Sequence, residues 1–422
     1  MPASAAPSAP PAPPAPPVPP APPSAAASPA TAATLDADEL GAWLHLLLSP
    51  GVGRDAARRL LAQFGSPQGV LDASLAALGS WVDGPTALGL TRPPDGHAQR
   101  LAATLAWLGG GPGRRVMVLG DADYPTPLLH AADPPLLLYL HGRSDLLHQR
   151  ALAIVGSRRP SAQGRDNARR FAAALAAQGW TIVSGLASGV DGAAHEGALA
   201  AGGDTIAVVG TGIDRIYPPS HRALAHQIAK TGLLVSELAL GTPPLAQNFP
   251  QRNRIIAGLA QGTLVVEAAL RSGSLITARL ASEAGREVMA IPGSILSPQS
   301  AGCHALIRQG AALVDSPQQV LEELGALPPR PAAAAPQMPK LPKLPKSPTV
   351  PATPKVPADA AAAAGSGDAV LRALGHDPQS LDALIDRCGW PAPALSAHLL
   401  TLELDGLVAR LPGGLYQRRQ AT

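Results

Sequence analysis

A series of short apolar runs that alternate with helical stretches is the feature that most constrains the fold of this chain. Continuous apolar runs, in place of alternating ones, are typical of strands that are buried on both faces. Strands that alternate with helices predict a parallel α/β sheet, here a Rossmann-like, mostly parallel one. The predicted strands cover residues 152–155, 181–184, 205–209, 233–235, 263–266, 288–291 and 312–314, and an extended segment at 123–140 precedes them.

Small-residue turns follow four of these predicted strands. In open α/β sheets the ligand crevice lies at the carboxyl ends of the strands, and backbone N–H groups in such turns can hold phosphate. No G-x-G-x-x-G fingerprint follows the first of these strands and no Walker A sequence occurs, which argues against a dinucleotide cofactor or an ATPase. We predict no cofactor and no metal. The turns are Gly156-Ser157-Arg158, the turn beginning Ser184-Gly185, Gly210-Thr211-Gly212 and Ser272-Gly273-Ser274.

The stretch from Phe249 to Ala278 combines an aromatic residue, a basic cluster and one of these turns. Arg252, Asn253 and Arg254 follow Phe249 closely, and Pro250 with the polar run predicts a loop at this point. A ring held on a loop is poorly placed for the core, and functional groups concentrate on loops carried by rigid scaffolds. Arginines beside an exposed ring suit a nucleotide or single-stranded nucleic acid.

Three titratable residues near the strand ends have a structural and a catalytic interpretation. Asp191 and His195 lie one helical turn apart and could form an acid/base pair. We favour a helix cap for Asp191 and local packing or hydrogen bonding for His195. Glu267 closes a predicted strand and could be a buried base, but we favour a role as hydrogen-bond acceptor for neighbouring turns.

Composition shifts divide the 422 residues into five segments. Residues 1–34 are rich in Pro and Ala and predict a disordered tail, and residues 327–366, rich in Pro, Ala and Lys, predict a linker. Residues 36–112 predict a helical domain and residues 116–326 the α/β domain. Residues 368–418 predict three helices and a β-hairpin, the pattern of a winged helix.

Neither flanking domain has the charge pattern of a strong DNA binder. The Gly51-Val52-Gly53 turn resembles a helix-hairpin-helix or SAM-like unit, but acidic residues outnumber basic ones in 36–112. A packing turn, a phosphate-binding turn and a partner-docking role all stay open there. The third helix of the winged helix, at 392–404, contains no Arg, Lys or Asn. Because such side chains usually read base edges, we expect a protein-interaction or weakly DNA-binding module.

Whole-chain charge and cysteine content set the remaining limits. The formal net charge is only +3, so any nucleic-acid site must be a local patch. Cys303 and Cys388 stand far apart without metal or redox spacing, which fits a reducing compartment. Nothing resembles a transmembrane span or a signal peptide, and we predict a cytoplasmic protein without membrane contact.

Ordered motifs across 116–315 resemble the DNA-processing protein A (DprA, also called Smf) family. They begin with Y-P-x-x-L at 124–128, D-P-P-x-x-L-Y at 133–139 and A-I-V-G-S-R at 153–158. V-S-G-L-A-S-G-V-D follows at 183–191 and G-T-G-I-D-x-I-Y-P at 210–218. The series ends with F-P-Q-R-N-R-I-I-A-G-L at 249–259, S-G-S-L-I-T-A at 272–278, I-P-G-S at 291–294 and L-I-R-Q-G-A at 306–311.

The resemblance implies a non-catalytic protein that binds single-stranded DNA, forms a homodimer and loads RecA recombinase onto incoming DNA in natural transformation. It implies phosphate contacts by the arginines and turns, an orienting role for Asn253 and base stacking on Phe249. A nucleotide hydrolase of the lysine-decarboxylase-like superfamily, using Glu267, and a winged-helix transcription regulator are the alternatives. The predicted DNA-binding residues are Gly156, Ser157, Arg158, Ser184, Gly185, Asn248, Phe249, Arg252, Asn253, Arg254, Ser272, Gly273 and Ser274.

Overall fold

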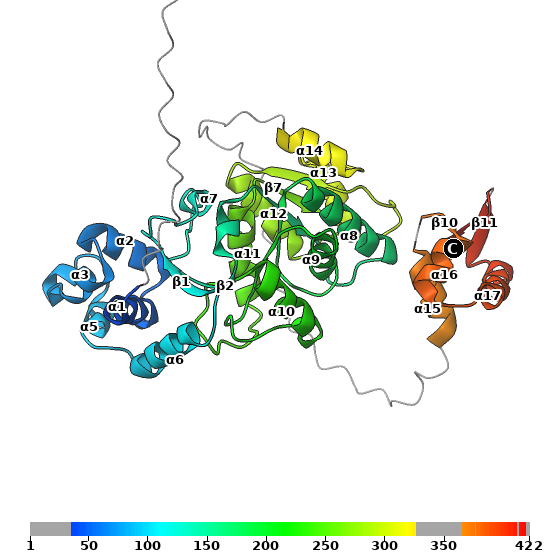
Figure 1. The fold of residues 1–422 in the computed structure, drawn as a ribbon. Coiled ribbons are helices and arrows are strands. Elements are labelled where there is room, and N and C mark those ends of the chain that lie inside the picture. Colours follow the sequence, from blue (N-terminus) through cyan, green and yellow to red (C-terminus); the bar gives the residue numbers. More distant parts are fainter. Residues whose placement is uncertain (1–34, 326–364, 376, 412, 419–422) are drawn as a thin grey trace, which may run out of the picture. The chain divides into compact units, whose positions relative to one another are not determined.

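The structure, a computed structural model, describes residues 35–325, 365–375, 377–411 and 413–418. The predicted tail at 1–34 and nearly all of the predicted linker lie outside these residues. Between residues 35 and 325 the chain forms a helical domain followed by an α/β domain (Figure 1). The helical domain consists of α1 (Ala37–Leu48), α2 (Arg54–Phe64), α3 (Pro67–Leu71), α4 (Leu75–Leu78), α5 (Gly84–Leu90) and α6 (His97–Gly109).

A nine-stranded sheet in the order β1-β2-β6-β5-β4-β3-β7-β8-β9 organises the α/β domain. The seven strands from β6 to β9 in this order are parallel, and β1 and β2 join them as an antiparallel edge. This confirms the mostly parallel sheet. The strands are β1 (Arg114–Val118), β2 (Leu137–Gly142), β3 (Ala151–Val155), β4 (Thr181–Ser184), β5 (Thr205–Val208), β6 (Leu233–Ser236), β7 (Gly262–Val265), β8 (Glu287–Ala290) and β9 (Ala312–Leu313).

Alternate residues of the central strands belong to two separate apolar layers. Ala153 and Val155 of β3 pack with α7, α11, α12 and α13, whereas Leu152 and Ile154 pack with α8, α9 and α14. Both faces of the sheet are therefore covered, which explains the uninterrupted apolar runs. No helix of the described residues is long and apolar enough to cross a membrane. The helices are α7 (Thr126–Leu129), η1 (Ser144–His148), α8 (Ala162–Ala177), α9 (Val190–Ala200), η2 (Pro219–His221), α10 (Arg222–Thr231), α11 (Asn248–Leu259), α12 (Ser274–Glu283), α13 (Ala301–Arg308) and α14 (Pro317–Gly325).

The direction in which strands are added reverses next to β3. From β3 the chain continues to β4, β5 and β6 on one side, and it then returns to β7, β8 and β9 on the other. β3 and β7 are neighbouring strands, and the loops that follow their carboxyl ends therefore run in opposite directions. A sheet of this kind opens a crevice at such a switch point.

The helical domain shares its apolar core with the antiparallel edge of the sheet. Leu40 and Trp43 of α1 belong to the same buried cluster as Tyr139 of β2, and the ring centroids of Trp107 and Tyr139 lie 5.8 Å apart. The Gly51 turn between α1 and α2 has φ +84°, and a Cβ there would meet the Thr86 hydroxyl at 2.2 Å. Glycine is needed at this turn for backbone conformation and close packing.

Two features of the antiparallel edge were missing from the sequence prediction. Strand β1 begins at Arg114, before the predicted boundary at 116, and pairs with β2 over its whole length. The segment predicted as extended at 123–140 contains the helical turn α7 before β2 begins at Leu137. The short strand β1 escaped notice because two arginines, Arg114 and Arg115, open it and hide its apolar half.

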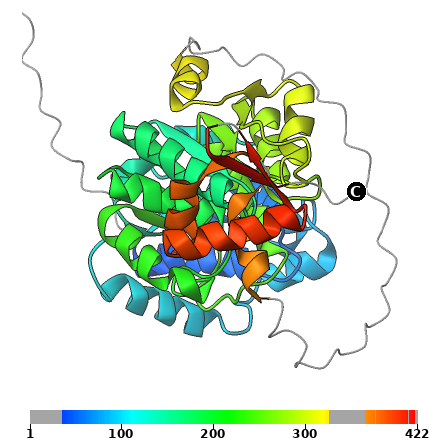
Figure 2. The same cartoon turned by 90° about the vertical axis from the view of Figure 1, so that its right-hand side faces the viewer.

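The last domain has the predicted winged-helix elements. Helices α15 (Gly365–Leu374), α16 (Leu381–Cys388) and α17 (Ala392–Leu404) surround a buried cluster that includes Leu384, Leu395 and Leu399. The hairpin of β11 (Val408–Leu411) and β12 (Leu415–Arg418) packs against α17 (Figure 2). The short strand β10 (Gln379–Ser380) pairs with β12 and completes a three-stranded sheet that the sequence did not predict.

Candidate nucleic-acid interface

A cleft of about 710 Å³ opens at the switch point of the sheet. Its walls are the loop after β3, the loop after β7, the start of α12 and the first turns of α11. Of the predicted residues, the cleft brings together Gly156, Ser157, Arg158, Phe249, Arg252, Asn253, Ser272, Gly273 and Ser274.

Phe249 forms a stacking group on the cleft wall. The Arg158 guanidinium carbon lies 5.2 Å from the centroid of its ring, and the ring of Tyr217 lies 5.8 Å away at 50°. Phe249 is half-buried and Tyr217 is exposed. A cation over one ring and a second ring beside it form a surface on which a flat, unpaired base can stack.

The predicted loop at Phe249–Arg254 is wrong. Helix α11 begins at Asn248, so this whole segment is helical. Gln247 precedes the helix without a side-chain capping bond, and Pro250 lies in the first turn. Proline is tolerated there because the first N–H groups of a helix need no intrahelical partner.

Arg252 lies at the floor of the cleft and is almost wholly buried. Its Nη1 donates to the Val208 carbonyl oxygen at 2.6 Å, and its guanidinium lies against Gly185, where a Cβ would be 1.7 Å from Nη1. Burial lowers the pKa of Arg252 to about 10, although the nearby Asp191 carboxylate opposes the shift. Arg252 therefore stays charged at neutral pH. The nearby Asp191 offsets part of its positive charge, and one of its N–H groups already donates to the protein backbone.

Backbone and hydroxyl groups of the Ser157 turn after β3 and of the Ser272 turn after β7 also line the cleft. The Ser157 N–H is already bonded to the Glu267 carbonyl oxygen at 2.7 Å, whereas the Gly273 N–H has no partner within the described residues. Asn253 donates from Nδ2 to the Gly273 carbonyl oxygen at 3.3 Å, which joins α11 to this turn. Ser272 and Ser274 share a hydroxyl hydrogen bond of 2.7 Å.

Three exposed arginines surround the mouth of the cleft: Arg158, Arg159 and Arg271. Within the described residues none of the three has a carboxylate at ion-pair distance. Unpaired guanidinium groups beside a stacking ring form a local positive patch, and such a patch is what a chain of net charge +3 needs in order to bind an anionic strand.

Four predicted residues do not line the cleft. Ser184 is fully buried and donates its hydroxyl to the Ile154 carbonyl oxygen at 2.6 Å. Gly185 makes room for the guanidinium of Arg252, and Asn248 is buried. Arg254 extends away from the cleft and forms ion pairs with Asp133 and Glu237. The geometry therefore does not support a phosphate contact by Arg254.

The residues with possible catalytic roles have structural partners. Glu267 accepts hydrogen bonds from the backbone N–H and hydroxyl of Ser161 at the start of α8, which confirms the favoured interpretation. His195 is fully buried and hydrogen-bonds through Nδ1 to the Thr205 hydroxyl at 2.7 Å, as the structural interpretation expected. Asp191 does not cap α9. It accepts from the Ala187 N–H at 3.3 Å and faces the cleft.

Sequence reasoning missed Arg159, Tyr217 and Arg271 as cleft residues. Each lies within or beside a motif that the sequence had singled out, namely the turn after β3, the I-Y-P segment and the Ser272 turn. Adjacency to a strand-end turn was the signal that could have found Arg159 and Arg271. The position of the Tyr217 side chain at the cleft depends on the path of the long loop after β5, and no local sequence pattern predicts that path.

Comparisons with known proteins agree on one family. The family profile of DNA recombination-mediator protein A matches residues 115–325. Protein Smf of Escherichia coli K12 is 42% identical over 326 residues, which cover 76% of this chain and 82% of that protein. The crystal structure of DNA processing protein A from Streptococcus pneumoniae matches 69% of this chain and 98% of its own, with a TM-score of 0.60 and 37% identity. The chain belongs to the DNA-processing protein A family.

The C-terminal domain of this DNA-processing protein A family member also matches a family profile. The DprA winged helix domain covers residues 353–414, of which the part before residue 365 lies outside the described structure. Its helix α17 exposes Leu400 and Leu404. The surface of α17 thus carries apolar side chains where a base-reading helix carries Arg, Lys or Asn.

Proposed function

We propose that this protein binds single-stranded DNA in the cleft at the β3/β7 switch point and, as a homodimer, loads RecA recombinase onto that strand during natural transformation and recombination. One observation carries the proposal. Three arginines without an ion pair among the described residues line the cleft together with a half-buried ring, and one of them, Arg158, lies over that ring. The names of the relatives, which are DNA-processing and recombination-mediator proteins, support a DNA ligand.

The stacking ring favours a single strand over a duplex. Arg158 and Tyr217 both lie close to the Phe249 ring on the cleft wall, and a base without a pairing partner is free to turn its flat face toward this ring. Arginines that contact phosphates add affinity without reading sequence. We therefore expect binding with little sequence preference, as for other proteins that combine a cationic groove with aromatic side chains.

We propose no catalytic activity. Glu267, the residue on which a nucleotide hydrolase would depend, accepts two hydrogen bonds at the start of α8 and does not line the cleft. Burial raises the pKa of Glu267, and the Ser161 hydrogen bonds oppose that shift. The carboxyl group thus completes the turn before α8. Release of free base from a nucleoside monophosphate, lost in Glu267→Gln, would instead establish the enzyme.

Binding of labelled oligothymidylate and of a matched duplex by the full chain tests the DNA ligand. We expect a preference for the single strand, lost in Arg158→Ala. Arg169→Ala is the matched control, because Arg169 is an exposed arginine that is paired with Glu196 and does not line the cleft. Equal binding of duplex and single strand, unchanged by Arg158→Ala, would remove the cleft from the proposal.

Assembly of RecA on a strand coated with single-strand-binding protein tests the loading role. The full chain should accelerate RecA assembly, and Arg158→Ala should not. Sedimentation of the full chain without DNA tests the homodimer. Single-strand binding without accelerated RecA assembly would retain the DNA ligand and reject the loading role.

A further inference from the structure

Helix α11 connects the cleft with an ion-pair network on the opposite side. Phe249 and Arg252 face the cleft, whereas Arg254 points away from it. Two residues correspond to about 200° of rotation around an α-helix, so the two arginines leave nearly opposite faces. A rotation or shift of α11 that moves Arg254 must also move Phe249 and Arg252.

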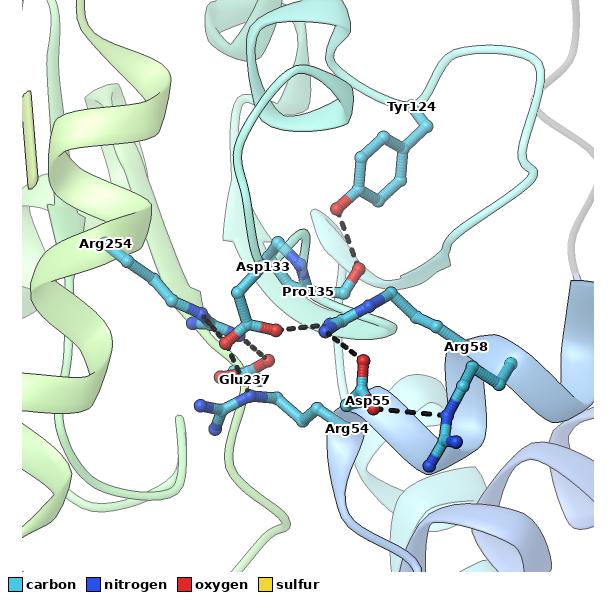
Figure 3. A network of polar contacts seen from close by, with 9 residues as sticks. Arg54, Asp55, Arg58, Tyr124, Asp133, Pro135, Glu237 and Arg254 are labelled. Atoms are coloured by element: carbon cyan, nitrogen blue, oxygen red, sulfur yellow. Dashed lines mark hydrogen bonds and ion pairs between the residues drawn. The ribbon is translucent and has the colours of Figure 1, made fainter. Parts of the chain in front are cut away.

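The Asp133 carboxylate is the centre of the network (Figure 3). Its oxygens accept hydrogen bonds from Nε of Arg254 at 2.8 Å, from Nε of Arg54 at 2.8 Å and from Arg58. Arg54 and Arg58 belong to α2 of the helical domain, and Arg254 to α11 of the α/β domain. One carboxylate therefore links the two domains at the helix that carries the cleft residues.

The network is partly buried, and the charges of its arginines and carboxylates stabilise one another. Arg254 is 9% exposed and pairs also with Glu237. Burial would raise the pKa of Asp133, but the guanidinium groups outweigh burial and hold it below its ordinary value. Three guanidinium groups share the Asp133 carboxylate, so removing one of them takes a hydrogen bond from Asp133 and frees that carboxylate to shift relative to Arg254.

The segment that carries Asp133 is itself held in place. The Tyr124 hydroxyl donates to the Pro135 carbonyl oxygen at 2.7 Å. Leu128 of α7 packs against Gly258 of α11, where a Cβ would approach it within 2.9 Å. The segment therefore connects α2, through Asp133, with α11, through Arg254 and the Leu128 contact, and can transmit a displacement of α2 to α11.

We propose that Arg54 and Arg58 are positioning residues of the DNA cleft: through Asp133 they fix Arg254 and thereby the rotation of α11. This inference rests on the proposed single-strand binding. It assigns the helical domain a role in DNA affinity without a DNA contact of its own. It also replaces the predicted phosphate contact of Arg254 by an indirect role.

Arg58→Ala and Arg59→Ala in the full chain form a matched pair for the test. Both arginines lie on α2, but among the described residues Arg59 pairs only with Asp55, and Arg58 is the one that reaches Asp133. Arg58→Ala should weaken oligothymidylate binding by about 2- to 30-fold, the range of indirect couplings. Arg59→Ala should bind like the wild type, and Arg58→Lys should recover part of the loss.

Two further measurements separate positioning from contact and from general damage. The salt dependence of binding should keep its slope in Arg58→Ala, because no phosphate contact is lost. Amide hydrogen exchange should accelerate in the first turns of α11 while that of β3 and β4 stays unchanged. A reduced salt slope would mean that Arg58 contacts DNA, and unchanged affinity with unchanged α11 exchange would equally overturn the inference.

Failure of the inference can be distinguished from failure of the proposed function. A wild-type chain that does not bind oligothymidylate refutes the function, while exchange in α11 still tests the coupling without DNA. If Arg58→Ala unfolds, Arg54→Ala replaces it, because Arg54 is the more exposed partner of Asp133. A folded Arg54→Ala with wild-type affinity and wild-type α11 exchange would then decide against the coupling.

Discussion

Replacement of Arg271 by alanine tests the phosphate sites of the cleft most directly. Arg271 is exposed, lines the cleft beside the Ser272 turn, and has no carboxylate at ion-pair distance within the described residues. Its removal therefore deletes one positive charge without leaving a buried partner behind. The fold should tolerate the change, since exposed substitutions usually alter stability by less than about 0.5 kcal/mol.

The expected magnitude follows from the number of unpaired arginines at the cleft. Three of them, Arg158, Arg159 and Arg271, correspond to a log–log salt slope of about −2.1 for a single strand, at roughly −0.7 for each phosphate. Arg271→Ala should reduce the slope to about −1.4. A tenfold rise in salt should then weaken binding by about 25-fold in the variant, against about 130-fold in the wild type.

Fluorescence anisotropy of a short labelled oligothymidylate, titrated at several salt concentrations, measures both slopes. Arg279→Ala is the control, because Arg279 lies on α12 nearby but pairs with Glu283 and does not line the cleft. A wild-type slope in Arg271→Ala would refute the reasoning, since an arginine that contacts phosphate must release a counterion on binding.

The remaining predictions concern the stacking ring, the buried arginine and the buried histidine. Phe249→Ala should cost roughly 1–3 kcal/mol of single-strand binding if a base stacks on the ring; unchanged affinity together with a lower melting temperature would make the ring part of the core. Arg252→Ala should lower the free energy of unfolding by about 1–3 kcal/mol, because the buried Val208 carbonyl loses its hydrogen-bond donor. Urea titrations measure this difference, and an unfolding curve like that of the wild type would contradict it. Burial lowers the pKa of His195 to about 3, with His221 and Arg252 adding to the shift. As pH decreases, His195 is therefore protonated in the unfolded chain before it is protonated in the folded protein. The free energy of unfolding should fall as pH decreases from about 6.5 toward 3, with a slope of up to about 1.4 kcal/mol per pH unit. His195→Gln should flatten this pH dependence in acid unfolding, and an unaltered profile would count against a neutral buried imidazole.

The sheet and its strand-end turns could be predicted because they depend on local patterns. Apolar runs on strands that are covered on both faces are visible in the sequence, and small residues mark the points where the chain leaves each strand. Most of the predicted residues at these turns and at the start of α11 do meet in the cleft. Strand β1 and the start of α11 were missed because arginines interrupt the first and no capping side chain marks the second.

The fate of the two arginines in the R-N-R motif shows what the sequence could not decide. Arg252 and Arg254 are two residues apart and both are buried, yet one lies at the floor of the cleft and the other pairs with Asp133, 121 residues away. Their directions follow from helical periodicity only once the segment is known to be helical. The partners that hold them come from distant parts of the chain.

The sequence by itself determined the class of fold, the order of the elements and the edge of the sheet at which a ligand can bind. These properties follow from the periodicity of apolar residues and from the residue types found in turns, and both are patterns within short segments of the sequence. Only the tertiary structure decided that Tyr217 joins Phe249 and Arg158, and that the helical domain reaches α11 through Asp133. Such arrangements depend on long-range packing and on the need to compensate buried charge, and no short segment of the sequence carries that information.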